Sequence, residues 1–176
     1  MGQYFLLVNE DKKEYVSPWA IDGGGKLWEW IANIDECGVI TSLVLDGWGG
    51  DNIVLIGDYD ESKLYDVVEK SYKEISKRAK SLFMKNKDII RSKSKIYAIN
   101  ETTKEYVYGS FKQVSMCLTL LLRKSSEGGG GDIYNDYESA GAWAENKIVI
   151  KSEKPSKKYA DINSAVYKEA FDFYNG

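Results

Sequence analysis

Hydrophobic and polar positions in the first half of the chain predict a series of short, alternating elements. Two β-rich runs at residues 3–8 and 14–17 flank a polar turn, which is typical of a β-hairpin. Apolar residues at helical spacing predict a helix over 26–34, and a run dense in β-branched residues predicts a strand over 52–56. Apolar residues at three- and four-residue spacing then predict one long amphipathic helix over 64–82. The order of elements is ββαβα.

The second half of the chain shows the same order of elements. A hairpin is predicted over 95–108, a helix over 111–122, a strand over 147–150 and a last helix over 161–174. Because a unit of roughly 80 residues buries too little surface to be generously stable alone, we expect the two units to pack together.

Direct comparison of the two halves supports an internal duplication. VNEDKKEYV at residues 8–16 matches INETTKEYV at 99–107, where most positions are identical. Trp48 falls on Trp143, and YKE at 72–74 falls on YKE at 167–169. The sequence therefore predicts an α+β fold in which two ββαβα copies pack with pseudo-two-fold symmetry.

The predicted division of the chain follows from these matches. The first repeat covers 1–83, a basic linker covers 84–94, and the second repeat covers 95–176. Since each repeat supplies the interface that the other lacks, we expect a monomer.

Composition excludes several classes of function. The 176 residues carry 24 Lys and Arg against 27 Asp and Glu, and there is no histidine, so mechanisms that need imidazole as a base, acid or metal ligand are excluded. The two cysteines, Cys37 and Cys117, lack metal-ligand spacing and are typical of buried small hydrophobes. We therefore expect no catalytic residues, no metal site and no cofactor.

The chain also lacks the patterns of membrane proteins and of targeting segments. No run of about 18 apolar residues is present, and the first residues lack the basic region of a signal peptide. We expect a cytoplasmic protein that does not engage a membrane.

Two segments carry a resemblance to a known family. The chain opens with MGQYFLLVNEDKKEY at 1–15, and WGGDNIVLIGDY follows at 48–59. These segments resemble a family of uncharacterised bacterial, archaeal and viral proteins that open with MGQYY-x-x-VN-x-DKKEY and carry W-A-G-D-R-I-V-I-x-G-D-Y. WAENKIVI at 143–150 and the glycine-rich loop at 128–132 echo that middle segment. The family has no established activity, so the resemblance implies a shared scaffold and the role of an accessory protein of a virus or mobile element. A viral source would place the protein in the host cytoplasm.

The chain is rich in aromatic residues, and Trp48 and Trp143 are candidate binding residues. Its 13 Tyr and 5 Trp exceed what a core of this size needs, and both residue types are enriched at contact surfaces. Trp48 and Trp143 either stack on a ligand or anchor the core, and burial is the favoured alternative. Trp28 and Trp30, on an apolar helix face, are expected to point inward.

Asp51 and Asp58, which flank the strand at 52–56, are the other candidate binding residues. Two carboxylates close together could hold a divalent cation. At the matching positions of the second copy stand Asn146 and Glu153, which favours a structural role in turns.

Two further features could bind anions. DGGGKL at 22–27 is similar to the end of a phosphate loop but lacks its remaining residues, which favours a flexible turn before a helix. The basic stretch at 77–95 offers a possible polyanion contact, with a solvated surface as the alternative. The candidate residues of that contact are Lys77, Arg78, Lys80, Lys85, Lys87 and Arg91.

These observations lead to one functional hypothesis and one alternative. The hypothesis is a non-catalytic binding protein that engages a protein or a small ligand through an aromatic surface between the repeats. The alternative is a metal-dependent enzyme that acts on a nucleotide or a nucleic acid, with a metal at Asp51 and Asp58.

Overall fold

The computed structural model describes residues 2–124 and 137–175 of the chain. The glycine-rich loop at 128–132 lies outside these residues. The first half of the chain contains, in order, β1 (Phe5–Asn9), β2 (Glu14–Val16), the 3-10 helix η1 (Pro18–Ile21), α1 (Leu27–Ala32), α2 (Ile34–Leu43), the short helical segment η2 (Val44–Trp48), β3 (Asn52–Gly57), α3 (Leu64–Ser71), β4 (Lys73–Glu74) and α4 (Ser76–Lys85).

The remaining elements begin with a short helix that lies between the two halves of the chain. They are, in order, α5 (Lys87–Arg91), β5 (Ile96–Asn100), β6 (Glu105–Gly109), α6 (Phe111–Leu121), β7 (Arg123–Lys124), β8 (Asn146–Lys151), β9 (Ala160–Asp161) and α7 (Asn163–Asn175). The predicted α+β class is confirmed.

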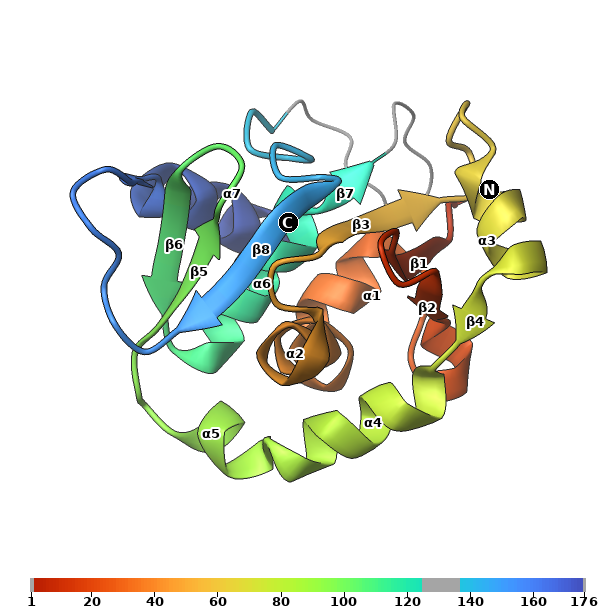
Figure 1. Ribbon diagram of the computed structural model, residues 1–176, viewed down its shortest axis with the longest axis horizontal. Helices are drawn as coiled ribbons and strands as arrows, with labels where there is room; N and C mark the ends of the chain where they lie inside the picture. Colours follow the sequence, from red (N-terminus) through yellow and green to blue (C-terminus); the bar gives the residue numbers. More distant parts are fainter. Residues whose placement is uncertain (1, 125–136, 176) are drawn as a thin grey trace.

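One mixed sheet runs through the molecule (Figure 1). Its strand order is β4-β2-β1-β3-β8-β5-β6-β9, and β7 pairs with β3 beside this path. The hairpins β1–β2 and β5–β6 are antiparallel, as are the pairs β1–β3 and β5–β8. The edge pairs β2–β4 and β6–β9 are parallel, and β3 meets β8 antiparallel in the middle. The halves are thus joined by the pairing of β3 with β8.

The two faces of the sheet are covered differently. Alternate residues of β1 point to opposite faces, so that Phe5 and Leu7 belong to the large core with the helices, whereas Leu6 and Val8 pack with Val68 of α3. On the outer face of the second half, Tyr97, Ile99 and Tyr106 form a small cluster. The large core therefore lies on one face of the sheet, and both halves of the chain contribute side chains to it.

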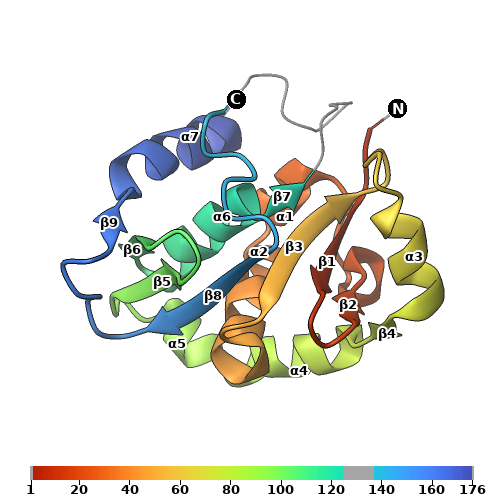
Figure 2. The same cartoon turned by 45° about the horizontal axis from the view of Figure 1, so that its top comes forward.

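The large core is shared by the two halves of the chain. It contains side chains of α1 and α2 together with side chains of α6 and α7. α4 and α5 run along one side of the molecule from the first half to the second (Figures 1 and 2). The predicted linker at 84–94 therefore contains the end of α4 and the whole of α5.

The long helix predicted over 64–82 is wrong. Tyr72 is extended, with φ −92° and ψ 159°, and it ends α3. Lys73 and Glu74 then pair with Glu14 and Tyr15 of β2, and α4 begins at Ser76. Each half therefore has an additional short strand, β4 or β9, before its last helix. When α1, α3, α5, β7 and the segments η1 and η2 are set aside, the order of elements in each half is ββαββα.

The match of residues 72–74 to 167–169 is also wrong. The first segment leads into and forms β4, whereas the second lies within α7. Identical residues at three positions do not overcome this difference in structure.

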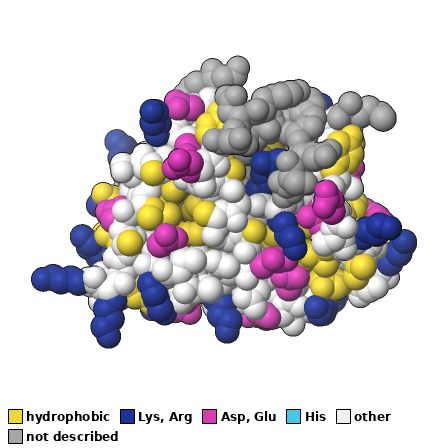
Figure 3. All heavy atoms as spheres, turned by 90° about the horizontal axis from the view of Figure 1, so that it is seen from above, with side chains coloured by type: hydrophobic (Ala, Val, Ile, Leu, Met, Phe, Trp, Pro, Cys, Tyr) yellow, Lys and Arg dark blue, Asp and Glu magenta, His cyan; other side chains and the backbone are white. Residues whose placement is uncertain are grey.

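The described surface mixes charges of both signs. Seen from above, Lys and Arg side chains are interspersed with Asp and Glu, and hydrophobic side chains show between them (Figure 3). None of the described helices has the length and apolarity required to cross a bilayer.

A buried hydroxyl pair joins α2 to α6 and gives a first testable prediction. Thr41 Oγ1 lies 2.6 Å from Ser115 Oγ, and Ser115 donates to the Phe111 carbonyl, so the threonine donates within the pair. Thr41→Val, which keeps the shape of the side chain, should lower the free energy of unfolding by about 1 kcal/mol. Urea denaturation of Thr41→Val, Ser115→Ala and the double variant measures the coupling, and purely additive losses would contradict the prediction.

Candidate functional site

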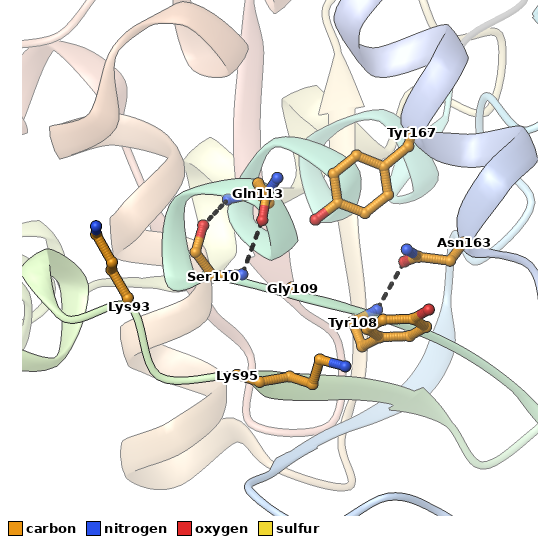
Figure 4. A pocket seen from close by; sticks show the side chains of 8 residues that line it. All are labelled: Lys93, Lys95, Tyr108, Gly109, Ser110, Gln113, Asn163 and Tyr167. Atoms are coloured by element: carbon orange, nitrogen blue, oxygen red, sulfur yellow. Dashed lines mark hydrogen bonds between the residues drawn. The ribbon is translucent and has the colours of Figure 1, made fainter.

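The candidate site is a cavity of about 540 Å³ in the second half of the chain. It lies where β6 ends, α6 begins and the first turns of α7 pass (Figure 4). Its lining residues are Lys93, Lys95, Tyr108, Gly109, Ser110, Gln113, Asn163 and Tyr167. A cavity of this size is in the range of small-molecule sites.

The wall formed by α6 is fixed by a capping box. Ser110 Oγ accepts a hydrogen bond from the Gln113 amide, and Gln113 Oε1 accepts one from the Ser110 amide at 2.9 Å. This reciprocal pair begins an 11-residue helix next to the cavity. The positive end of the helix dipole therefore lies beside the cavity.

The wall formed by β6 is held by a side chain of α7. Asn163 Oδ1 accepts a hydrogen bond from the Tyr108 amide at 2.8 Å. The parallel pairing of β6 with β9 involves only Glu105 and Tyr106, so the end of β6 would otherwise present an open edge. Asn163 thus fixes the position of Tyr108 relative to α7.

The Tyr167 hydroxyl is buried and has no hydrogen-bond partner among the described residues. Gly109 permits its close approach, because a Cβ at this position would lie only 2.0 Å from the Tyr167 oxygen. Burial raises the pKa of Tyr167, so the group stays protonated and can act as a donor. In Figure 4 the hydroxyl points toward the side of the cavity that Gln113 and Ser110 form.

Two lysines give the cavity a positive charge. Lys95 Nζ lies 4.3 Å from the ring centroid of Tyr108. Lys93 also lines the cavity, on the left in Figure 4, whereas Tyr108 and Asn163 lie on the right. The eight lining residues include no carboxylate. Two ammonium groups, a phenol and a helix start are the groups that bind anions in proteins.

The structure buries the two tryptophans predicted as binding residues. Trp48 and Trp143 are both 0% exposed. Trp48 Nε1 donates to Glu14 Oε2 and Trp143 Nε1 donates to Glu105 Oε2, each at 2.9 Å. Both indoles belong to the large core, so stacking on a ligand at the surface is wrong for them and packing is correct.

The two aspartates predicted to flank a metal do not come together. Asp51 precedes β3 and Asp58 follows it, so about 23 Å of extended chain separates them. Asp51 accepts from Asn9 and pairs with Lys12, whereas Asp58 accepts from the Tyr4 amide. No group of three His, Cys, Asp or Glu residues that could hold a metal is present in 2–124 and 137–175.

Half of the six basic residues proposed for a polyanion contact have acidic partners. Arg78 pairs with Glu14 at 3.5 Å, Lys80 with Asp22, and Lys85 with Asp46 at 3.5 Å. Lys77, Lys87 and Arg91 complete the set on α4 and α5. The basic stretch is thus partly neutralised within the fold.

The glycine-rich turn at 22–27 binds carboxylates of the chain itself. The Gly24 amide donates to Glu36 Oε1 at 2.9 Å, and the Lys26 amide donates to Glu29 Oε2 at 2.8 Å. A Cβ at Gly23 or Gly24 would collide with these carboxyl groups. The glycines therefore allow two glutamates to take the place that a phosphate would need.

Sequence patterns missed the residues of the cavity. Lys95 and Tyr108 belong to a predicted hairpin, and Asn163 and Tyr167 belong to a predicted helix, but no motif links these segments. Trp28 was expected to point inward and is instead 47% exposed, whereas Trp30 is buried as expected. The only signal near the site was the overall excess of tyrosine.

Comparisons with protein-family models, with curated proteins and with solved structures found no match. The resemblance seen in the opening motif therefore stays a prediction.

Proposed function

We propose that the protein is a non-catalytic binding protein whose ligand is a small anion, such as a phosphorylated or carboxylated metabolite. The ligand binds in the cavity between β6, α6 and α7. The observation that carries this proposal is the meeting of Lys93, Lys95 and the unpartnered Tyr167 hydroxyl around one cavity without an acidic lining residue.

The groups around the cavity have complementary tasks in binding. The lysines supply charge, which increases the rate and strength of anion capture at low ionic strength. The Tyr167 hydroxyl supplies a directed hydrogen bond. A bound ligand would accept this bond and so remove the free-energy cost of leaving a buried donor without a partner. The Tyr108 ring supplies apolar area beside Lys95.

We also infer that the chain arose by duplication, and three paired sets of contacts support this inference. In the first set, the two tryptophans occupy equivalent positions. Trp48 donates to Glu14 at the start of β2, and Trp143 donates to Glu105 at the start of β6. The strand order also reads the same outward from β3 and from β8.

The second set lies at the turns of the two hairpins. Lys13 and Lys104 have positive φ, and each places its ammonium over a tyrosine ring, Tyr72 and Tyr159 respectively. On this register Lys73 of β4 corresponds to Ala160 of β9.

The third set lies beside the cavity and shows how the halves differ. The Ser17 amide donates to Ser76 Oγ, as the Tyr108 amide donates to Asn163 Oδ1. In the first half, however, η1 follows at once, and Trp19 packs against Tyr4 with ring centroids 5.6 Å apart. An anion site in one copy only would be a result of divergence after duplication.

Titration calorimetry with inorganic phosphate, citrate and AMP, with uncharged adenosine as the comparison, tests the proposed function. We expect at least one anion to bind, and Lys95→Met to weaken that binding at least ten-fold. Tyr167→Phe should weaken it several-fold while the fold is kept. Binding should also weaken as salt is raised.

The matched control is Lys70→Met, which removes an exposed lysine of α3 outside the cavity. Its affinity for the anion should equal that of the unmodified protein. If none of the three anions bound at millimolar concentration, or if Lys70→Met had the same effect as Lys95→Met, the proposal would be wrong.

A further inference from the structure

Glu36, in the first turn of α2, is a buried carboxylate with one oxygen that lacks a partner. The residue is 1% exposed. Its Oε1 accepts from the Gly24 amide at 2.9 Å and from Asn33 Nδ2 at 3.0 Å. Its Oε2 is buried and has no hydrogen-bond partner among the described residues. A buried carboxylate left in this state is costly unless a donor or a cation satisfies it.

A second cavity, of about 300 Å³, lies directly at this carboxylate. Its lining residues are Gly24, Trp28, Glu29, Ala32, Asn33 and Glu36, none of which lines the anion cavity. Trp28 is 47% exposed and presents an indole at the cavity. Glu29 adds a second carboxylate, whose Oε2 accepts from the Lys26 amide. The cavity thus combines negative charge with an aromatic wall.

This combination favours an organic cation over a metal ion. A calcium or magnesium ion needs six or more oxygen ligands in a regular arrangement, and an indole wall cannot supply them. An ammonium or guanidinium group gains from an aromatic face and from a carboxylate at the same time. The unpartnered Oε2 requires an N–H donor, which a quaternary ammonium does not have.

We propose that the cavity between α1 and α2 binds the primary ammonium or guanidinium group of an organic cation, with Glu36 as its hydrogen-bonding acceptor and Trp28 as its aromatic wall. Glu29 contributes charge. The terminal torsion of a glutamate is soft, so we expect Oε2 to turn toward the bound cation. The cation is either a free alkylamine or the side chain of a lysine or arginine on a partner.

Protonation of Glu36 couples this site to pH. Burial is the main cause that raises the pKa of Glu36 to about 7. The hydrogen bonds from Gly24 and Asn33 oppose this rise, and the neighbouring carboxylates Glu29 of α1 and Asp35 of α2 add to it. A bound cation favours the ionised carboxylate, so binding displaces a proton below pH 7. Affinity should therefore rise as the pH is raised from 5.5 to 8 and then level off.

Titration calorimetry at pH 8 with 1,4-diaminobutane and with Nα-acetyl-lysine amide tests this proposal, and tetramethylammonium serves as the comparison without a donor. We expect one or both amines to bind and tetramethylammonium to bind at least ten-fold more weakly. Binding of the diamine alone points to a free alkylamine, and preference for the lysine amide points to a partner's side chain. No binding of either amine at millimolar concentration would overturn the proposal.

Variants of the full chain separate this site from general charge effects. Glu36→Gln keeps the size and the Oε1 acceptor of Glu36 and should weaken amine binding at least ten-fold, and Trp28→Ala should weaken it several-fold. Glu61→Gln removes an exposed carboxylate outside the cavity and should leave binding unchanged. Lys95→Met should also leave amine binding unchanged, so failure of the anion site and failure of this site are distinguishable. An equal loss in Glu36→Gln and Glu61→Gln would show that the amine responds to net charge only.

Discussion

Trp143→Ala is expected to lower the free energy of unfolding by about 3 to 5 kcal/mol. The Trp143 indole is fully buried in the large core, so its removal loses transfer free energy and leaves a cavity. Its Nε1 also donates to Glu105 Oε2 at 2.9 Å, and the truncation leaves that carboxylate without this donor. Guanidinium denaturation followed by circular dichroism measures the change.

Two control variants separate packing from the hydrogen bond and from aromatic surface. Trp143→Phe keeps most of the apolar volume and removes the donor, so its loss should be smaller than that of the alanine variant. Trp28→Ala removes an indole that is 47% exposed and should change stability by about 0.5 kcal/mol or less. A loss of less than about 1 kcal/mol for Trp143→Ala would contradict the role of Trp143 in the core. A loss for Trp28→Ala as large as the loss for Trp143→Ala would contradict it as well.

The hairpins and central strands could be predicted because their patterns are local. β1 and β5 are short runs of apolar residues next to a polar turn, and β3 and β8 are dense in β-branched residues. Such a pattern depends only on the residues of one short segment, and each of these strands is formed by one such segment.

The break in the predicted long helix could not be found from its pattern. Val68, Tyr72, Ile75 and Ala79 follow helical spacing across the break, yet Tyr72 is extended and β4 lies between the two helices. The deciding contact is the parallel pairing with β2, about 60 positions earlier in the chain, where the Ile75 amide donates to the Tyr15 carbonyl. A local pattern contains no information about such a partner.

The same reason explains which site residues sequence analysis missed. Asp51 and Asp58 are close in sequence, but an extended strand holds them far apart, whereas Lys95 and Tyr167 are distant in sequence and line one cavity. For the glycine-rich turn at 22–27, sequence analysis favoured a flexible turn over anion binding, and in the structure the Gly24 and Lys26 amides of this turn bind carboxylates of the chain. Its occupants are Glu29 and Glu36, whose role depends on the packing of α1 and α2.

Glu36 also gives the second large expected effect, a loss of stability as the pH rises. The pKa of Glu36 is about 7 in the folded protein against an ordinary value of 4.5. Between these two values the unfolded chain has released this proton and the folded chain still holds it, so folding is favoured less with each increase in pH. The stabilisation that the folded state gains by holding this proton is fully present below about pH 4.5 and is lost as the pH rises through 7. A shift of this size corresponds to about 3 kcal/mol.

The measurement compares the unmodified protein with Glu36→Gln from pH 4 to pH 8, in buffers free of primary amines. Glutamine keeps the acceptor for the Gly24 and Asn33 donors and cannot ionise, so all other titrating groups cancel in the difference between the two proteins. We expect the free energy of unfolding of Glu36→Gln to exceed that of the unmodified protein by an amount that grows by about 3 kcal/mol over this range. A difference that stays constant with pH would show that Glu36 ionises normally in the folded state, and a difference that shrinks would mean that its charge is stabilised.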